Sequence, residues 1–315
     1  MEEDRTPDLR IANATLSQLS YHPTKSAGLY SRSRPATIRA AARGDGRYNF
    51  PQHLARNPDM DIKPPYGYQE IVPLTKQQRV VMPEGRRLPL VFRSLTALPL
   101  SYTEFGAACR DYPIAFVSGD AGKTFLPMAI LGLENQQNLF VSANGDWDAA
   151  VYFPAYIRRY PFCMTRVTVE GKEQAERIAC VEKRAINDKG AALYDAKGEP
   201  LPLWEERRKL LFEYEADLVR SEEMCRTLAE LELLEGFTMQ AAPNQGNRVA
   251  MTGMHRVAEG KLAGLSPEKL KMLVEKGILA RVYAHLISLN NFGRLLDRRS
   301  ATQAPGAKAK GGAKS

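Results

Sequence analysis

The sequence predicts an α+β fold, in which an antiparallel-rich sheet in the N-terminal half packs with helices that come mainly from the C-terminal half. Two observations support this prediction. Short apolar runs of strand length fill the chain up to about Glu182, whereas a long helical pattern begins at about Pro202. Strands that come first and helices that come later are typical of α+β proteins rather than of doubly wound α/β proteins.

The expected strands of the N-terminal half are short and are separated by turn residues. They are Glu70–Leu74, Leu90–Ser94, Ile114–Val117, Phe125–Leu131, Leu139–Ser142, Arg166–Val169 and Ile178–Glu182. The third and fourth runs flank SGDAGKT, which predicts a hairpin. Pro99–Arg110 is expected to be helical, because Ser101 and Glu104 have the spacing of a capping box.

Apolar residues recur every three or four positions from Pro202 to Glu235, which predicts one long helix with Gly236 as its C-cap. After it, Phe237–Ala242 and Arg248–Val257 are expected to pair as a hairpin over the turn PNQGN.

The segment LSPEKLKMLVEKG has the residues that begin and end a short helix. Ser266 suits the N-cap, Pro267 suits the first helical position, and Gly277 suits the position after the C-cap. A last helix is expected from Ile278 to about Leu296.

Three segments are expected along the chain. Residues 1–60 are rich in Ser, Arg and Pro without a sustained hydrophobic period, so we expect a flexible basic arm. Residues 61–297 are expected to form the folded domain. Residues 298–315 include ATQAPGAKAKGGAKS, whose composition predicts a disordered Lys-rich tail.

The net charge of +8 is carried by the two ends of the chain. Residues 1–50 and 298–315 together contain 13 of the 44 basic residues and 5 of the 36 acidic residues. The remaining 31 basic and 31 acidic residues lie between 51 and 297. A duplex-binding domain concentrates basic charge on its folded surface, so we expect no specific nucleic-acid partner. The tail could still provide weak electrostatic tethering to an anionic partner.

No stretch approaches the roughly 20 apolar residues that span a bilayer. The first ten residues, MEEDRTPDLR, lack the apolar core of a secretory signal. We therefore expect no transmembrane segment and a cytoplasmic protein, with signal-free export left open. The four cysteines form no CxxC pair and are expected to be free thiols.

Several local patterns begin to look like catalytic or cofactor sites without completing them. Gly119–Thr124, GDAGKT, ends like a phosphate-binding loop, but Val117 stands where that motif requires its first glycine. The four histidines form no HxH or HExxH pair, and no GxSxG elbow is present. We therefore expect no cofactor and no metal, and we assign no catalytic residue.

The densest feature is Trp147–Phe162, which is rich in aromatic residues and contains two arginines. Helical spacing is expected for Trp147–Tyr160, with a stripe of tyrosines on one face and Asp146 as its cap. One interpretation is a core helix, and the other is a recognition surface for a peptide, a sugar or a partner protein. The predicted binding residues are Asp146, Trp147, Asp148, Tyr152, Tyr156, Arg158 and Arg159.

Six blocks follow one another between Tyr66 and Asp297. They are YQEIVPL (Tyr68–Leu74), PLSYTEFGAACRDYPIAF (Pro99–Phe116), LGLENQQNLFVSANGDW (Leu131–Trp147), GDWDAAVYFPAYIRRYPF (Gly145–Phe162), ALYDAKGEP (Ala192–Pro200) and LSPEKLKMLVEKGILARVYAHLISLNNFGRL (Leu265–Leu295). Each block alone is weakly specific. In this order over about 230 residues, they resemble the bacterial SapC family.

The resemblance implies a link to bacterial surface layers, because the family is named from a surface-layer gene cluster. Related genes lie beside flavin-dependent halogenases and dioxygenases, and the resemblance supplies no catalytic residue. The leading hypothesis is a SapC-like, non-enzymatic binding or accessory protein that recognises a peptide or protein partner in a surface-layer context.

The alternative hypothesis is an enzyme or enzyme subunit that modifies a peptide or small metabolite alongside halogenases or dioxygenases. It requires Asp146, Asp148, Arg158 and Arg159 to converge on one pocket. His255 or His285 would be an optional further member. A structural surface-layer subunit is a third class, which the four cysteines and the pI near 9.3 disfavour.

Overall fold

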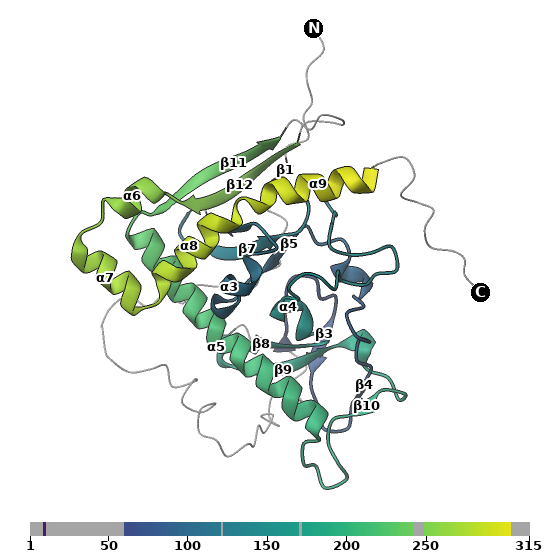
Figure 1. Ribbon diagram of the computed structural model, residues 1–315. Coiled ribbons are helices and arrows are strands. Elements are labelled where there is room, and N and C mark those ends of the chain that lie inside the picture. Colours follow the sequence, from purple (N-terminus) through teal and green to yellow (C-terminus); the bar gives the residue numbers. More distant parts are fainter. Residues whose placement is uncertain (1–8, 11–59, 121, 170–171, 242–248, 304–315) are drawn as a thin grey trace. The chain divides into compact units, whose positions relative to one another are not determined.

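The computed structural model describes residues 9–10, 60–120, 122–169, 172–241 and 249–303 (Figure 1). These residues form antiparallel sheets and helices, which confirms the α+β class. The expected PNQGN turn and most of the expected arm and tail lie outside the described residues. No helix of the described part is long and apolar enough to cross a membrane.

The chain divides into two compact units, and the segment 61–297 is shared between them. Unit 1 draws on Met1–Ala14, Arg86–Pro154 and Ser221–Ser315, and unit 2 draws on Thr15–Gly85 and Ala155–Arg220.

Unit 1 contains a six-stranded sheet with the order β1-β12-β6-β7-β5, and β11 also pairs with β12. All of these pairs are antiparallel except β1 with β12. Val117 of β6 faces Leu126 of β7, which confirms the expected hairpin. The strands are β1 (Leu9–Arg10), β5 (Ala97–Pro99), β6 (Ile114–Val117), β7 (Leu126–Ile130), β11 (Leu234–Ala241) and β12 (Val249–Val257).

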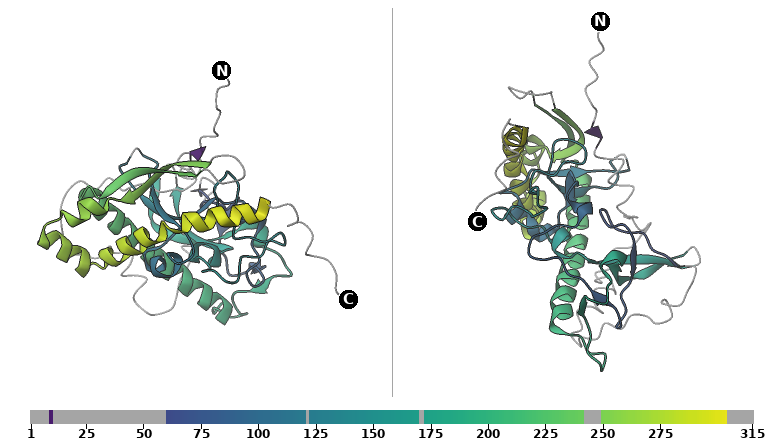
Figure 2. Two further views of the ribbon diagram at one scale, coloured as in Figure 1. Left: turned by 45° about the horizontal axis from the view of Figure 1, so that its top comes forward. Right: turned by 90° about the vertical axis from the view of Figure 1, so that its right-hand side faces the viewer.

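Helices α8 and α9 of unit 1 pack on this sheet. Helix α8 contacts β6 and β12, and Phe237 of β11 packs against Phe292 of α9 with ring centroids 6.2 Å apart. Figure 2 shows α9 beside the β11–β12 hairpin. The helical elements are η1 (Leu90–Phe92), η2 (Tyr102–Glu104), α3 (Phe105–Ala108), α5 (Pro202–Glu230, from Ser221 onward), α6 (Glu259–Ala263), α7 (Pro267–Glu275), α8 (Ile278–Ser288) and α9 (Asn291–Gln303).

The residues expected to begin and end the short helices do so. The Glu104 carboxylate accepts the Ser101 N–H at 2.9 Å, which forms the capping box before α3. Ser266 caps α7, with its hydroxyl accepting the Lys269 N–H at 3.4 Å. Gly277 takes a φ of +68° between α7 and α8, a conformation that glycine adopts without steric cost.

His285 of α8 is fully buried and joins its helix to two strands of the sheet. Its Nδ1 lies 2.8 Å from the Ile114 carbonyl oxygen of β6, and its Nε2 accepts the Val257 N–H of β12 at 3.1 Å. Because a backbone N–H can only donate, Nε2 is unprotonated and Nδ1 carries the proton. Burial lowers the pKa of His285 to about 4. Ser288 adds a second link, since its Oγ accepts the Ile114 N–H at 2.9 Å.

Unit 2 contains a four-stranded antiparallel sheet with the order β2-β8-β9-β3, and a separate pair of β10 with β4. Its core includes Phe162 and Trp204, whose ring centroids lie 5.2 Å apart. The remainder of α5, up to Arg220, belongs to this unit. Its other elements are β2 (Met60–Asp61), β3 (Ile71–Pro73), β4 (Arg79–Val80), α4 (Ala155–Arg158), β8 (Phe162–Val169), β9 (Lys172–Glu182), η3 (Lys183–Ala185) and β10 (Ala191–Ala192).

The end of α5 differs from the expectation. Glu232 takes a φ of +54° and donates its N–H to the Ala229 carbonyl, while the Leu233 N–H donates to Leu228, both at 2.9 Å. This is a Schellman ending with a non-glycine residue in the left-handed position. Gly236 is therefore not the C-cap, and it lies in β11 instead.

Two expected strands are wrong. Leu90–Phe92 is a short 3-10 helix, in which the Phe92 N–H donates to the Pro89 carbonyl at 3.0 Å. In Leu139–Ser142 only an isolated bridge forms, between Val141 and Trp147. Both runs are short and apolar, and such runs do not distinguish a strand from a tight helical turn by periodicity.

The expected last helix is broken in two. Helix α8 ends at Ser288, where the Ser288 hydroxyl donates back to the His285 carbonyl at 2.6 Å. Helix α9 then begins at Asn291 and continues to Gln303, so it extends into the segment that the sequence assigned to the tail.

Acidification should destabilise unit 1 through His285. Because its folded pKa of about 4 lies below the unfolded value of about 6.5, its stabilising contribution is present above pH 6.5 and is lost as the pH falls toward 4. We expect this group alone to remove about 2 kcal/mol of unfolding free energy between pH 7 and pH 5. Urea unfolding should show that His285→Gln is less stable than wild type at pH 7. The variant should also lose less unfolding free energy than wild type when the pH is lowered. An equal loss in the two proteins would contradict this account.

Candidate functional site

Only α4 is helical in the segment expected to form one helix from Trp147 to Tyr160. Pro154 immediately precedes α4. A proline disfavours helical angles at the residue before it, and it has no N–H to donate to the preceding turn. The expected helix, the tyrosine stripe along it and the capping role of Asp146 are therefore wrong. We call residues 145–153, which form turns and extended chain, the Trp147 loop.

The predicted binding residues are divided between the two units. Unit 1 holds Asp146, Trp147, Asp148 and Tyr152, and unit 2 holds Tyr156, Arg158 and Arg159.

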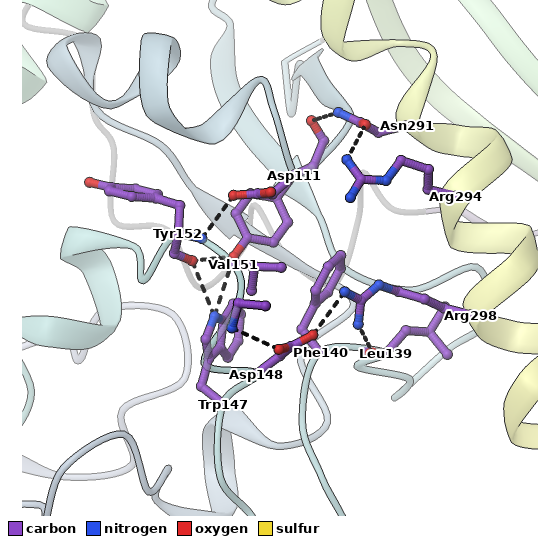
Figure 3. Close-up of polar contacts among 12 residues, drawn as sticks. Asp111, Leu139, Phe140, Trp147, Asp148, Val151, Tyr152, Asn291, Arg294 and Arg298 are labelled. Atoms are coloured by element: carbon purple, nitrogen blue, oxygen red, sulfur yellow. Dashed lines mark hydrogen bonds and ion pairs between the residues drawn. The ribbon is translucent and has the colours of Figure 1, made fainter.

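Trp147 lies in the core of unit 1, with 2% of its surface exposed. Its Nε1–H donates to the Tyr152 carbonyl oxygen at 3.1 Å and lies 3.3 Å from the Tyr112 hydroxyl, which donates to the same carbonyl (Figure 3). Phe140 stacks on the indole with centroids 6.0 Å apart. Trp147 therefore holds the loop from inside, and its ring does not face solvent.

Asp148 fixes the loop through both carboxylate oxygens. Oδ1 accepts the Ala150 N–H at 2.9 Å, and Oδ2 pairs with Arg298 of α9 at 2.8 Å (Figure 3). The Ala150 N–H and the Arg298 guanidinium hold the pKa of Asp148 below its usual range. Arg298 also lies over the Phe140 ring, 4.4 Å from its centroid. Asp146, by contrast, is exposed.

Two further arginines of unit 1 hold the loop, and no local pattern in the sequence indicates either. Arg86 Nη1 donates to the Asp148 carbonyl at 2.8 Å and to the Val151 carbonyl at 3.1 Å. The Arg93 guanidinium occupies the space into which a side chain at Gly145 would project. Both arginines are distant from the loop in sequence, so only tertiary structure brings them to it.

Tyr152 is held at both ends. Its N–H donates to Asp111 Oδ2 at 2.8 Å (Figure 3), and its hydroxyl donates to Glu104 Oε1 at 3.1 Å. Glu104 is also the carboxylate of the capping box before α3. One buried side chain therefore both begins a helix and positions this tyrosine.

In unit 2, Arg159 is buried among aromatic rings, with 3% of its surface exposed. Its guanidinium lies over the rings of Tyr68, Tyr156 and Tyr214, at 5.6, 4.2 and 4.7 Å from their centroids. Each such cation–π contact contributes roughly 0.5 to 2 kcal/mol. The neighbouring Arg158 is exposed.

The remaining sequence candidates have separate surroundings. In the loop that resembles a phosphate-binding motif, Asp120 accepts the N–H groups of Lys123 and Thr124 at 3.1 and 2.8 Å, so its own carboxylate fills the turn. His255 packs against the Phe125 ring at 4.9 Å, whereas His285 bridges α8 to the sheet. Within the described residues, no group of three or more His, Cys, Asp or Glu side chains could hold a metal ion.

An open pocket of about 620 Å³ forms a second candidate surface in unit 1. Its apolar lining comes from the end of β12, from Leu286 of α8 and from Leu289, which follows the last residue of α8. Glu235 and Arg256 form an ion pair of 2.9 Å at its rim. Pockets of this size and mixed lining commonly hold a ligand or an apolar side chain. Sequence reasoning did not identify this surface, because its parts are distant along the chain.

Residues 86–295 match the model of the SapC family. The chain belongs to the SapC family. The matched span begins at Arg86, so the block Tyr68–Leu74 precedes it, and it ends within α9 before Arg298. The matched span therefore includes the Trp147 loop and two of the arginines that hold it, Arg86 and Arg93. Comparison with curated proteins and with solved structures returned no match.

Gly145→Ala should destabilise the protein more than Gly85→Ala. Both glycines have positive φ, +88° and +55°, so both substitutions strain the backbone. Only at Gly145 would the new Cβ lie 2.1 Å from the Arg93 guanidinium carbon, whereas at Gly85 nothing lies within 4 Å. We expect a cost of about 1 kcal/mol at Gly85 and about 2 kcal/mol at Gly145, because the Arg93 guanidinium would have to shift away from the Leu88 carbonyl that its Nε binds. Chemical unfolding of both variants measures the difference, and equal costs would show that Arg93 is not held against the loop.

Arg159→Lys should destabilise unit 2 although it keeps the charge. A lysine ammonium cannot stack as a plane on three tyrosine rings, so we expect a loss of about 2 kcal/mol. Arg158→Lys is the matched control, because that side chain is exposed, and it should change stability by less than about 0.5 kcal/mol. Thermal and urea unfolding distinguish the two. Similar values for both variants would argue against a structural role for the tyrosine cluster.

Proposed function

We propose that this protein is a non-enzymatic binding or accessory protein that recognises a peptide or protein partner through the solvent-facing side of the Trp147 loop. The proposal rests on the many hydrogen bonds that fix the conformation of the loop. The polar atoms of Trp147, Asp148 and Tyr152 bond within unit 1, and arginines hold the loop carbonyls. A rigid loop reduces the conformational entropy lost when a partner binds.

The titratable groups around the loop favour binding over catalysis. Burial raises the pKa of Tyr112, and hydrogen bonds lower that of Asp148. Both shifts move the pKa of the group away from neutral pH. A general acid or base works best with a pKa near the operating pH. In unit 1, Asp148 is bound to Arg298 and His285 to Ile114, so neither supports the pocket that the enzyme alternative requires.

The class of partner follows from the family rather than from the loop. Because the family is named from a surface-layer gene cluster, a surface-layer subunit belongs among the partners to be tested. Cytoplasmic location and weak tethering by the Lys-rich tail are further parts of the proposal.

A random-peptide display library selected against the full-length protein tests this function. We expect enriched peptides to bind wild type and to lose at least about tenfold in affinity for Ala149→Tyr, which places a bulky neutral side chain on the exposed face of the loop. Ala280→Tyr, at an exposed position of α8 in the same unit, is the matched control and should bind normally.

A third variant, Gly260→Tyr, distinguishes the loop from the open pocket. Gly260 lines that pocket, and a Cβ built there meets nothing within 4 Å. Loss of binding for Gly260→Tyr, with normal binding for Ala149→Tyr, would move the site from the loop to the pocket. A library that yields no specific peptide would count against a peptide-binding function.

A further inference from the structure

We propose that the segment recognised at the Trp147 loop is acidic, and that it binds to arginines which surround the loop. The inference rests on the proposed function and specifies the chemistry of its partner. We call these five residues the arginine arc. They are Arg86, Arg87, Arg93, Arg294 and Arg298.

Contacts within unit 1 connect the arc to the loop. Arg298 binds the Asp148 carboxylate, and Arg86 binds the Asp148 carbonyl, so both meet at one residue. Arg294 lies one turn before Arg298 on α9, and both point toward the loop side of that helix in Figure 3. Residues four apart on a helix share a face.

Arg93 and Arg87 extend the arc to the start of the loop. The Arg93 guanidinium packs against Gly145. The backbone of Arg87 forms an antiparallel bridge with Asp146, and the Arg87 side chain is exposed. The arc therefore contacts both the start of the loop and its middle.

The arginines are held in place while part of each guanidinium stays available. Arg86 uses Nη1 for its two carbonyl bonds, and Arg93 uses Nε to bind the Leu88 carbonyl at 3.0 Å. Arg294 uses Nη1 for the Arg110 carbonyl. The same atom also binds the Asn291 side chain (Figure 3). A guanidinium has five N–H donors, so each group keeps donors for a ligand. Because these side chains are already ordered, binding through them costs less entropy.

Four arginines of the arc lack a carboxylate partner among the described residues. Arg298 pairs with Asp148, but the other four form no ion pair with any described residue. The remaining carboxylates near the loop are bonded to other groups or exposed. Asp111 accepts the Tyr152 N–H and Glu104 accepts the Tyr152 hydroxyl, whereas Asp146 and Asp297 are exposed. A partner with several carboxylates could pair with the four arginines, because a guanidinium binds a carboxylate through two parallel hydrogen bonds.

The same surface is poorly suited to nucleic acid. Proteins that bind single strands stack bases on exposed aromatic rings. Here Trp147, Tyr112 and Phe140 are each at most 2% exposed, so their ring faces are not available. An acidic peptide therefore fits the arc better than a polynucleotide does.

Fluorescence anisotropy with a labelled hexaglutamate peptide tests the inference on the full-length protein at low salt. We expect binding that weakens as salt rises, and a loss of about tenfold for Arg294→Glu, which changes an exposed side chain of the arc. Lys269→Glu makes the same change of charge at an exposed position of α7 and should leave binding within about twofold of wild type. A hexaglutamine peptide should not bind.

Three results would overturn the inference. Equal weakening by Arg294→Glu and Lys269→Glu would mean that net charge alone attracts the peptide. Loss of binding when Lys308, Lys310 and Lys314 are changed to Gln would assign it to the tail. Tighter binding of an oligothymidylate of equal charge would favour nucleic acid.

The display selection separates this inference from the proposed function. Neutral peptides that bind the loop, and whose affinity does not change with Arg294→Glu, would leave the proposed function standing and refute the acidic partner. Enrichment of Asp- and Glu-rich peptides that are sensitive to Arg294→Glu would support both.

Discussion

The His285 side chain joins α8 to two strands of the unit 1 sheet, because its Nδ1–H donates to the Ile114 carbonyl of β6 and its Nε2 accepts the Val257 N–H of β12. Only the neutral imidazole can make both bonds at once. The consequences reach the candidate site, since Tyr112, which binds the Tyr152 carbonyl, lies two residues before Ile114. A buried histidine that the enzyme hypothesis placed in a pocket is therefore a structural link between α8 and the sheet.

The loop itself is held by ionic and aromatic contacts from distant parts of unit 1. Arg86 and Arg298 meet at Asp148, and Trp147 provides the buried ring against which Phe140 packs. These contacts explain why an Asp-Trp-Asp sequence with many aromatic neighbours need not mark a reaction centre. The aromatic rings supply packing, and the acidic group anchors the loop to Arg298.

The errors of the sequence predictions have identifiable physical causes. Periodicity suggested a helix through Trp147–Tyr160, but Pro154 disfavours helical geometry at the residue before it. Gly236 looked like a helix end, but Glu232 takes the left-handed conformation and closes α5 before it. The predicted binding residues were also treated as one surface, whereas the division between compact units falls at Pro154 and Ala155. Local patterns identify such residues but do not show which of them are buried.

The sequence by itself determined the α+β class, the SapC family, the β6–β7 hairpin and the helix starts at Ser101 and Ser266. These features depend on residues a few positions apart, or on motifs that keep their order along the chain, so no tertiary information is needed to find them. Tertiary structure decided that Trp147 and Arg159 are buried, and that Arg86 and Arg298 meet at Asp148. Such contacts depend on the path of the backbone between distant segments, and hydrophobic periodicity carries no record of that path.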